Sequence, residues 1–260
     1  MHAILKALVA GIATIRTIQA IPLSQNWTPS STAQPAATVN VKEQLFRDLL
    51  SAPTANKRFQ RLLVQGESLV TGEILKELTV FNFNSPQPAS GAKGGAYKLA
   101  NIETFPIVAG LGISMAVGYF EPCGINTPHI HPRATEFFVL MEGSNVKFGY
   151  ILENGLVKSG QNPEIAGILS KYEGTVFPQG SIHFQFNEAC EKATFVAAFD
   201  SVDPGTSQVA QNFFNLDAGV VNATLGFPKT IDGSNIKEFR KTIPANLAQD
   251  VDNCLAKCRL

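Results

Sequence analysis

Short apolar runs separated by turn residues occupy the middle of the chain, from about residue 105 to residue 199. The runs are rich in β-branched and aromatic residues and show no helical periodicity. Many short strands with regular turns are typical of an antiparallel jelly roll or barrel. We therefore predict an all-β central region with strands at residues 113–120, 136–141, 147–152, 175–177 and 194–199.

The dipeptide Asn154-Gly155 follows the predicted strand at residues 147–152. Asn-Gly suits the type I′ turn of a two-residue hairpin, because both central residues of that turn need a positive φ. A tight hairpin is therefore expected at this point of the chain.

Helical patterns flank the predicted barrel on both sides. Apolar residues between 41 and 65 recur at helical spacing, and Pro53 predicts a break between two short helices. After the barrel, Ser234 is the expected N-cap of a helix over residues 234–243, and helical spacing continues over 245–258. We divide the chain into a segment at 1–20, an N-terminal arm of short helices and strands at 21–84, a barrel at 85–206 and a C-terminal helical extension at 207–260.

Residues 1–20 have the order of a secretory signal peptide. Lys6 supplies a positive charge, residues 7–15 form an uncharged and mostly apolar run, and Ala20 is a small residue suited to cleavage. The run is shorter than the roughly 20 residues that span a bilayer, so no membrane association is expected. The alternative is a buried N-terminal helix. With a signal peptide, the mature protein is secreted and extracellular, and His2 is lost.

The four cysteines fit an oxidising compartment, where an even count predicts two disulfides with three conceivable pairings. Cys254 and Cys258 are four residues apart in a predicted helix and so lie on one face. Pairing them leaves Cys123 and Cys190 for the second disulfide. The alternative is a thiolate metal site, which the absence of any C-x2-C pair disfavours.

Two N-x-T sequons are also consistent with secretion. They predict glycans on exposed backbone at Asn26 and Asn222.

The composition narrows the classes of function. The chain has 21 Lys and Arg against 21 Asp and Glu, and 45% of its residues are hydrophobic. This hydrophobic content excludes an intrinsically disordered chain. The absence of a basic excess argues against a nucleic-acid partner, because binding to phosphates depends on such an excess.

The chemistry is concentrated in two stretches that hold all the histidines except His2. His129 and His131 are two residues apart, so on a strand both side chains project to one face. Glu136 would face the other way on an unbroken strand, but Pro132 disfavours such a strand and a bend returns Glu136 to the same cavity. His183 joins them from a distant strand. Three imidazoles and a carboxylate suit Mn, Fe, Ni, Cu or Zn.

The spacings H-x-H-x4-E-x6-G, from His129 to Gly143, and P-x-G-x2-H-x3-N, from Pro178 to Asn187, resemble the paired motifs of the cupin superfamily. The sequences PHIHPRATE and HFQFN are similar to those of germins and germin-like proteins, including spherulin-like proteins of fungi and slime moulds. The resemblance covers roughly residues 107–206. It implies a single-domain cupin jelly-roll barrel that binds Mn²⁺, with iron as the alternative, through His129, His131, Glu136 and His183.

The same resemblance implies a secreted glycoprotein that forms homo-oligomers, with dimers assembling into hexamers. It also implies an oxidoreductase that acts on superoxide or on oxalate. Asn126 occupies the place of an asparagine that holds oxalate in the oxidases of the family, but Ala116 stands where a second asparagine is expected. This difference disfavours oxalate.

Superoxide needs fewer specific contacts from the pocket than oxalate does. A divalent metal with three neutral histidines and one carboxylate has a net charge of +1, which attracts a small anion. Arg133 either adds to this field or forms a structural ion pair at the barrel mouth. One alternative is a non-catalytic wall, spore or matrix protein in which the metal stabilises the oligomer. Another is a different cupin chemistry, such as that of an iron dioxygenase or a decarboxylase.

Overall fold

The computed structural model describes residues 41–226, 235, 238–239, 242–243, 246–249 and 252–260. The predicted signal peptide, the sequon at Asn26 and half of the predicted helix at 234–243 lie outside these residues. Among the described helices, none has both the length and the apolar character needed to cross a bilayer.

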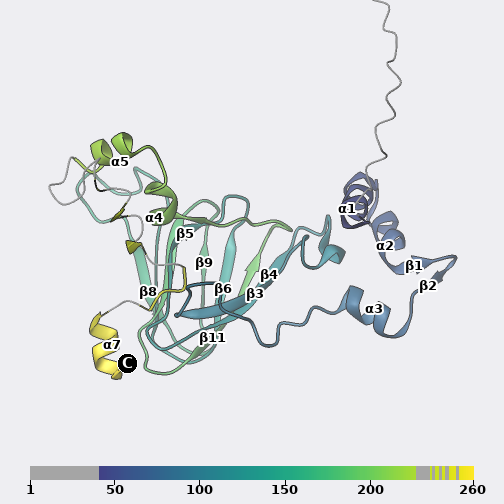
Figure 1. The fold of residues 1–260 in the computed structure, drawn as a ribbon, viewed down its shortest axis with the longest axis horizontal. Coiled ribbons are helices and arrows are strands. Elements are labelled where there is room, and N and C mark those ends of the chain that lie inside the picture. The colour runs from purple at the N-terminus through teal and green to yellow at the C-terminus, as the bar shows by residue number, and fades with distance from the viewer. Residues whose placement is uncertain (1–40, 227–234, 236–237, 240–241, 244–245, 250–251) are drawn as a thin grey trace, which may run out of the picture. The chain divides into compact units, whose positions relative to one another are not determined.

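Two five-stranded antiparallel sheets form the body of the protein (Figure 1). One sheet has the strand order β12-β5-β10-β7-β8 and the other β3-β4-β11-β6-β9. Successive strands from β5 to β11 pass repeatedly from one sheet to the other, as in a jelly roll, so the predicted all-β fold is confirmed. The strands are β3 (Gly95–Ala100), β4 (Ser114–Phe120), β5 (Ile125–Ile130), β6 (Glu136–Glu142), β7 (Val146–Ile151), β8 (Ile165–Leu169), β9 (Gly174–Phe177), β10 (Ile182–Asn187), β11 (Ala193–Phe199) and β12 (Ser207–Gln208).

Strict alternation of buried and partly exposed residues along β4 and β11 builds the apolar core. Strand β11 pairs with β4 on one side and with β6 on the other, so its inward side chains pack at the centre of the sheet. Phe195 stacks on Phe120 and Phe138, with ring centroids 4.7 and 5.2 Å apart. These contacts form a closely packed, rigid apolar layer inside the barrel.

The sequence pattern does not reveal every strand. The apolar pattern gives no bounds for β10, the distant strand expected to carry His183, because its inward residues are polar: His183, Gln185 and Asn187 are buried, while the residues between them are more exposed. Strands β7 and β8 pair antiparallel, so the hairpin predicted around Asn154-Gly155 is present, but its connection is not the expected two-residue turn. The two residues form a turn, but it lies within a longer connection, residues 152–164, between β7 and β8.

Before the barrel, α1 (Val41–Ser51) and α2 (Ala55–Leu63) are separated at Pro53, as predicted. Thr54 caps α2 by accepting a 3.2 Å hydrogen bond from the Lys57 N–H. A two-stranded hairpin and a third helix complete this part of the chain. They are β1 (Val64–Gln65), β2 (Ser68–Leu69) and α3 (Gly72–Thr79).

After the barrel strands, the chain forms α4 (Val209–Phe213), α5 (Ala218–Thr224) and α7 (Asp252–Cys258). The helix predicted over 245–258 is wrong in its first part. Residues 246–249 are not helical, and Ala248 forms a β-bridge with Ile125. Gly94, which has no side chain, lets the backbone of Leu247 and Ala248 approach closely. Tertiary pairing therefore overrides the helical spacing.

Two disulfides attach α7 to the barrel, and their pairing differs from the one expected. Cys123, in the β4–β5 loop, bonds to Cys254, and Cys190, in the β10–β11 loop, bonds to Cys258. Side chains four apart on a helix project in the same direction, whereas a disulfide needs two side chains that face each other. Cys254 and Cys258 therefore each reach a separate barrel loop.

Candidate metal centre

Four side chains from three strand regions converge inside the barrel. His129 lies near the end of β5, His131 directly follows that strand, Glu136 begins β6, and His183 lies in β10. Each is at most 7% exposed, and one ligand atom from each lies within 4.8 Å of every other. The bend after Pro132 brings Glu136 to the histidines, as predicted. The sequence-predicted set is thus assembled in one place.

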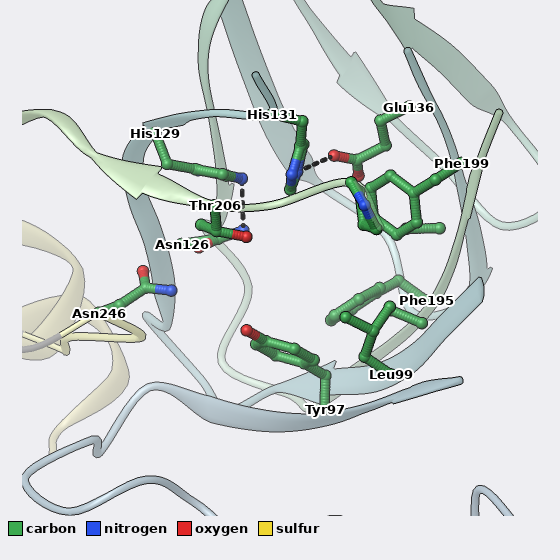
Figure 2. A pocket seen from close by; sticks show the side chains of 13 residues that line it. Tyr97, Leu99, Asn126, His129, His131, Glu136, Phe195, Phe199, Thr206 and Asn246 are labelled. Atoms are coloured by element: carbon green, nitrogen blue, oxygen red, sulfur yellow. Dashed lines mark hydrogen bonds and ion pairs between the residues drawn. The ribbon is translucent and has the colours of Figure 1, made fainter. Parts of the chain in front are cut away.

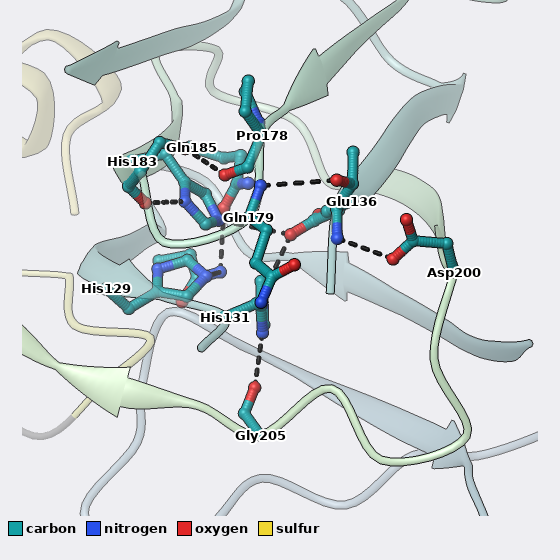
Figure 3. A network of polar contacts seen from close by, with 12 residues as sticks. His129, His131, Glu136, Pro178, Gln179, His183, Gln185, Asp200 and Gly205 are labelled. Carbon is teal, nitrogen blue, oxygen red and sulfur yellow. Dashed lines mark hydrogen bonds and ion pairs between the residues drawn. The ribbon is translucent and has the colours of Figure 1, made fainter. Parts of the chain in front are cut away.

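The three imidazoles are held in the orientation that metal ligation requires. Each Nδ1 faces a backbone carbonyl to which it can donate, and this contact directs Nε2 into the barrel (Figure 3). The Nε2 atoms of His131 and His183 lie 2.9 and 3.2 Å from Oε2 of Glu136. The carbonyls that accept from His129, His131 and His183 belong to Thr127 at 2.9 Å, Gly205 at 2.6 Å and Ser181 at 2.9 Å.

Burial controls the protonation of the site. It is the largest cause that lowers the pKa of His129, to about 3, and the neighbouring His183 lowers that pKa further. Burial alone would raise the pKa of Glu136, but hydrogen bonds from His131 and His183 outweigh it and bring that pKa to about 2. At neutral pH the site therefore holds a neutral His129 and an ionised Glu136, which are the states that bind metal.

The donor set fits a divalent cation. A carboxylate 3% exposed is costly to bury beside neutral imidazoles, and a cation would compensate its charge. Three nitrogens and one oxygen are the ligands of a transition-metal site rather than of Ca²⁺ or Mg²⁺, which prefer oxygen. Phe177 stacks on His183 with ring centroids 4.4 Å apart and shields this side of the site.

A cavity of about 40 Å³ lies beside the histidines (Figure 2). Since a single water needs roughly 10–15 Å³, the cavity admits a small molecule or a few waters. Its apolar wall comes mainly from β3, β4 and β11. The residues of this wall are Leu99, Ala116, Phe195, Ala197, Phe199 and Pro204. Ala116 occupies the position at which the resemblance to oxalate oxidases leads one to expect a second asparagine. It faces the cavity with a methyl group.

Asn126 lines the cavity close to His129. Its Nδ2 donates to Oε1 of Gln185 at 2.8 Å and lies 3.4 Å from Nε2 of His129. Oδ1 of Asn126 and Nε2 of Gln185 are buried without a hydrogen-bond partner among the residues described. Such atoms are costly unless a ligand or water satisfies them, so Asn126 is placed to contact a bound molecule. Gln185 was not singled out from the sequence, although its period-2 spacing from His183 is a signal for it.

Two further polar residues of the cavity were also missed. Tyr97 lies in β3, and both burial and the charge of Glu136 raise the pKa of its phenol, which therefore stays protonated. Asn246 lies in the segment that the sequence predicts as helix. Its Oδ1 accepts hydrogen bonds from the backbone N–H and the Oγ1 of Thr127, at 3.0 and 3.2 Å.

Arg133 forms an ion pair with Asp203 at 2.9 Å and also donates to the Asp203 backbone carbonyl. It does not line the cavity. The structural role considered for Arg133 is therefore the one the fold supports. Asn222 lies in α5, half-buried, rather than on the exposed backbone expected for a sequon, and its glycosylation stays a prediction.

Comparison with known proteins relates this arrangement to a family. Residues 81–231 match the family model described as Cupin. Spherulin-1A of Physarum polycephalum is 36% identical over 231 residues, which are 88% of this chain and 82% of that protein. Putative germin-like protein 3-2 of Oryza sativa subsp. japonica is 33% identical over 155 residues, which are 60% of this chain and 66% of that protein.

A solved structure of recombinant oxalate oxidase in complex with glycolate has a similar fold. Its TM-score is 0.55 and its identity 26%, over 69% of this chain and 89% of that one. Together with the family match and the converging histidines, these similarities define the class: the chain belongs to the cupin family. Within that family it is a spherulin-like and germin-like cupin.

Proposed function

We propose that this protein is a secreted, manganese-binding germin-like oxidoreductase that acts on superoxide, with oxalate as the second candidate substrate. The observation that carries the proposal is the convergence of His129, His131, Glu136 and His183, whose ligand atoms lie within 4.8 Å of one another. Secretion is supported by the two disulfides, which persist in oxidising compartments.

Manganese fits the donor set because it accepts both imidazole and carboxylate ligands, and iron is the alternative for the same reason. A bound redox metal would supply the one-electron chemistry. The chain's own residues hold it, keep the histidines neutral and exclude bulk water. Glu136 leaves one positive charge uncompensated on a divalent ion, which favours entry of a small anion.

Superoxide is favoured over oxalate by the wall of the cavity. Ala116 presents a methyl group and offers no hydrogen bond to a dicarboxylate. Nδ2 of Asn126 is already engaged by Gln185, which leaves an acceptor oxygen rather than a donor. A diatomic anion needs neither contact.

Metal analysis of the purified protein, followed by superoxide and oxalate assays, tests this proposal. We expect about one manganese per chain and superoxide dismutation in the wild type. H129A removes one ligand and should lose both the metal and the activity, while its thermal unfolding midpoint without metal shows whether the fold is kept. Retention of metal by H129A would contradict the site assignment.

A non-catalytic role in an oligomer is the second candidate. Exposed apolar side chains on the outer face of the β4–β11–β6–β9 sheet favour it, since such patches mark association surfaces. Phe137 is 51% exposed there, beside Ile113 and Val176. We propose a homo-oligomer, with dimers assembling into a hexamer, and no nucleic-acid or membrane partner. Light scattering gives the oligomer mass, and a full metal load without activity would favour this second role.

A further inference from the structure

The two disulfides that attach α7 to the barrel lie in contact with each other. Cys258, the partner of Cys190, has its Sγ 3.6 Å from the Sγ of Cys123. Cys123 belongs to the other disulfide, with Cys254. The Sγ atoms of Cys123, Cys254 and Cys258 all lie within 4.8 Å of one another. Because exchange between disulfides begins when a thiolate reaches a disulfide sulfur, this contact places the two bonds for exchange.

Solvent reaches the two disulfides to different extents. Cys190, in the β10–β11 loop, is exposed, and Cys258 is half-buried. Cys123 is fully buried, and Cys254 is 7% exposed. Reaction of a disulfide with a thiol in solution depends on access to one of its sulfur atoms. A small thiol therefore meets the Cys190–Cys258 disulfide first, at the sulfur of Cys190.

Attack at Cys190 produces a nucleophile beside the buried disulfide. The sulfur of the small thiolate bonds to Sγ of Cys190, the Cys190–Cys258 bond breaks, and Cys258 leaves as a thiolate with the electron pair. The Cys258 thiolate then bonds to Sγ of Cys123, and Cys254 leaves as a thiolate that takes a proton from water. The small thiol is oxidised and Cys254 is reduced, so two S–S bonds are present before and after.

The second step needs little movement of the chain. The sulfurs of Cys258 and Cys123 lie 3.6 Å apart and must approach by about 1.5 Å to reach the bonded distance of about 2.05 Å. Cys254 and Cys258 both belong to α7. The helix therefore stays attached to the barrel through Cys123 in either pairing.

The surroundings of Cys254 suit it as the leaving group. Its Sγ lies 3.8 Å from the backbone carbonyl of Glu188, which is an acceptor for the thiol once Cys254 is protonated. Nζ of Lys257 donates to the same carbonyl at 3.4 Å, and a nearby ammonium stabilises a thiolate. Cys254, Glu188 and Lys257 also line a surface pocket of about 310 Å³, which gives the released side chain room.

We propose that Cys190 is a modification site for a small thiol, and that Cys258 passes the exchange on to the buried disulfide of Cys123 and Cys254. The product carries the small thiol on Cys190, a new disulfide between Cys123 and Cys258, and a free thiol at Cys254. The metal ligands take no part in these steps, so this proposal goes beyond the proposed function and is tested separately from it.

Peptide mapping of the full chain after treatment with one equivalent of reduced glutathione tests the proposal. Samples taken over time are quenched in acid, alkylated under denaturing conditions and mapped without reduction. We expect glutathione on Cys190, a peptide in which Cys123 is linked to Cys258, and alkylation of Cys254. The untreated protein should show none of these three products.

Two variants separate the two steps. C190S leaves Cys258 as a free thiol, so the second step should proceed without any added thiol. Its map should contain both pairings of Cys123, with alkylation of Cys258 in one population and of Cys254 in the other. C190S/C258S keeps only the buried disulfide and is the control, and glutathione should leave its Cys123–Cys254 bond intact. Thermal unfolding shows whether each variant is folded.

The possible results separate clearly. Absence of the Cys123–Cys258 peptide from both the treated wild type and folded C190S overturns the proposal, and where C190S does not fold, its absence from the treated wild type alone does so. Glutathione on Cys254 with Cys190 free overturns the proposed order of attack. Loss of the Cys123–Cys254 bond in folded C190S/C258S as fast as in the wild type would show direct attack on the buried disulfide, and it also overturns the proposal.

Discussion

His129 and His183 face each other across the β5–β10 pair as direct register partners, with ring centroids 4.2 Å apart. Each ring donates from Nδ1 to the carbonyl two residues earlier in its own chain segment, Thr127 for one and Ser181 for the other, at 2.9 Å in both cases. The same local hydrogen bond on two adjacent strands sets both Nε2 atoms toward the interior. Backbone geometry therefore positions two ligands before a metal binds.

Acid should destabilise the metal-free protein through these buried groups. The pKa of His129 falls from 6.5 to about 3 on folding, and that of Glu136 from 4.5 to about 2. In both cases the unfolded chain binds the proton more readily than the folded protein does. The contribution of each group to the free energy of unfolding is therefore fully present above its pKa in the unfolded chain. It is lost as the pH falls toward the pKa of that group in the folded protein. Urea titrations should show a falling free energy of unfolding from pH 6.5 down to 3 for His129, and from 4.5 down to 2 for Glu136.

The slope of the free energy of unfolding against pH has an upper limit for a single titrating group. One group contributes at most about 1.4 kcal/mol per pH unit. H129Q removes the titration of His129. It should flatten the curve of the free energy of unfolding against pH between pH 6.5 and 4.5, while the decrease below pH 4.5 remains. An unchanged slope in H129Q would show that another group causes the acid sensitivity.

Removing the charge of Glu136 should weaken the metal site while preserving its shape. E136Q is close to isosteric, but it replaces an anionic oxygen ligand by a neutral amide. Because loss of an outer-shell partner already costs roughly 10–100-fold in metal affinity, loss of this ligand should cost at least about tenfold. Competition with a chelator of known affinity measures the change. E142Q, at the exposed other end of β6, is the control and should bind manganese as the wild type does.

The sequence was sufficient to predict the ligands because their signal is local. His129 and His131 share a strand face through a two-residue step, and Pro132 accounts for Glu136. The residues Tyr97 and Asn246 could not be predicted in this way. Asn246 reaches the cavity only because Ala248 pairs with Ile125, a contact between distant segments, and helical spacing nearby indicates the wrong element.

The disulfide pairing was unpredictable for a related reason. Four cysteines allow three pairings, and sequence distance favours the nearest pair. The observed pairs join residues separated by 131 and 68 positions, which only the docking of α7 against two barrel loops brings together. Strand existence was easier to predict, since the alternation along β4 and β11 is a property of each strand alone.

The two disulfides should contribute separately to stability. Non-reducing peptide mapping should recover Cys123 linked to Cys254 and Cys190 linked to Cys258. The double variant C123S/C254S should lower the free energy of unfolding by about 2–4 kcal/mol, as should C190S/C258S, because each disulfide restricts a long loop of the unfolded chain. Recovery of a peptide in which Cys254 is linked to Cys258 would contradict the structure.

Close packing at Gly94 should couple the C-terminal segment to the cavity. A Cβ at this position would collide with the backbone carbonyls of Leu247 and Ala248, which cannot move as a flexible side chain can. G94A should therefore displace the segment that carries Asn246 and destabilise the protein by about 1–3 kcal/mol, as overpacking does. Thermal unfolding measures the stability. Competition with a chelator measures the manganese affinity, which depends on Asn246 because Asn246 accepts from Thr127, whose carbonyl accepts from His129.

Gly219 provides the matched control for this change. It lies in α5, where an added Cβ would meet only a side-chain oxygen of Asp217 at 3.2 Å. G219A should therefore have a small effect on stability and leave the manganese affinity unchanged. If G94A retained both the wild-type unfolding midpoint and the wild-type manganese affinity, the close approach of residues 247 and 248 to Gly94 would not position Asn246.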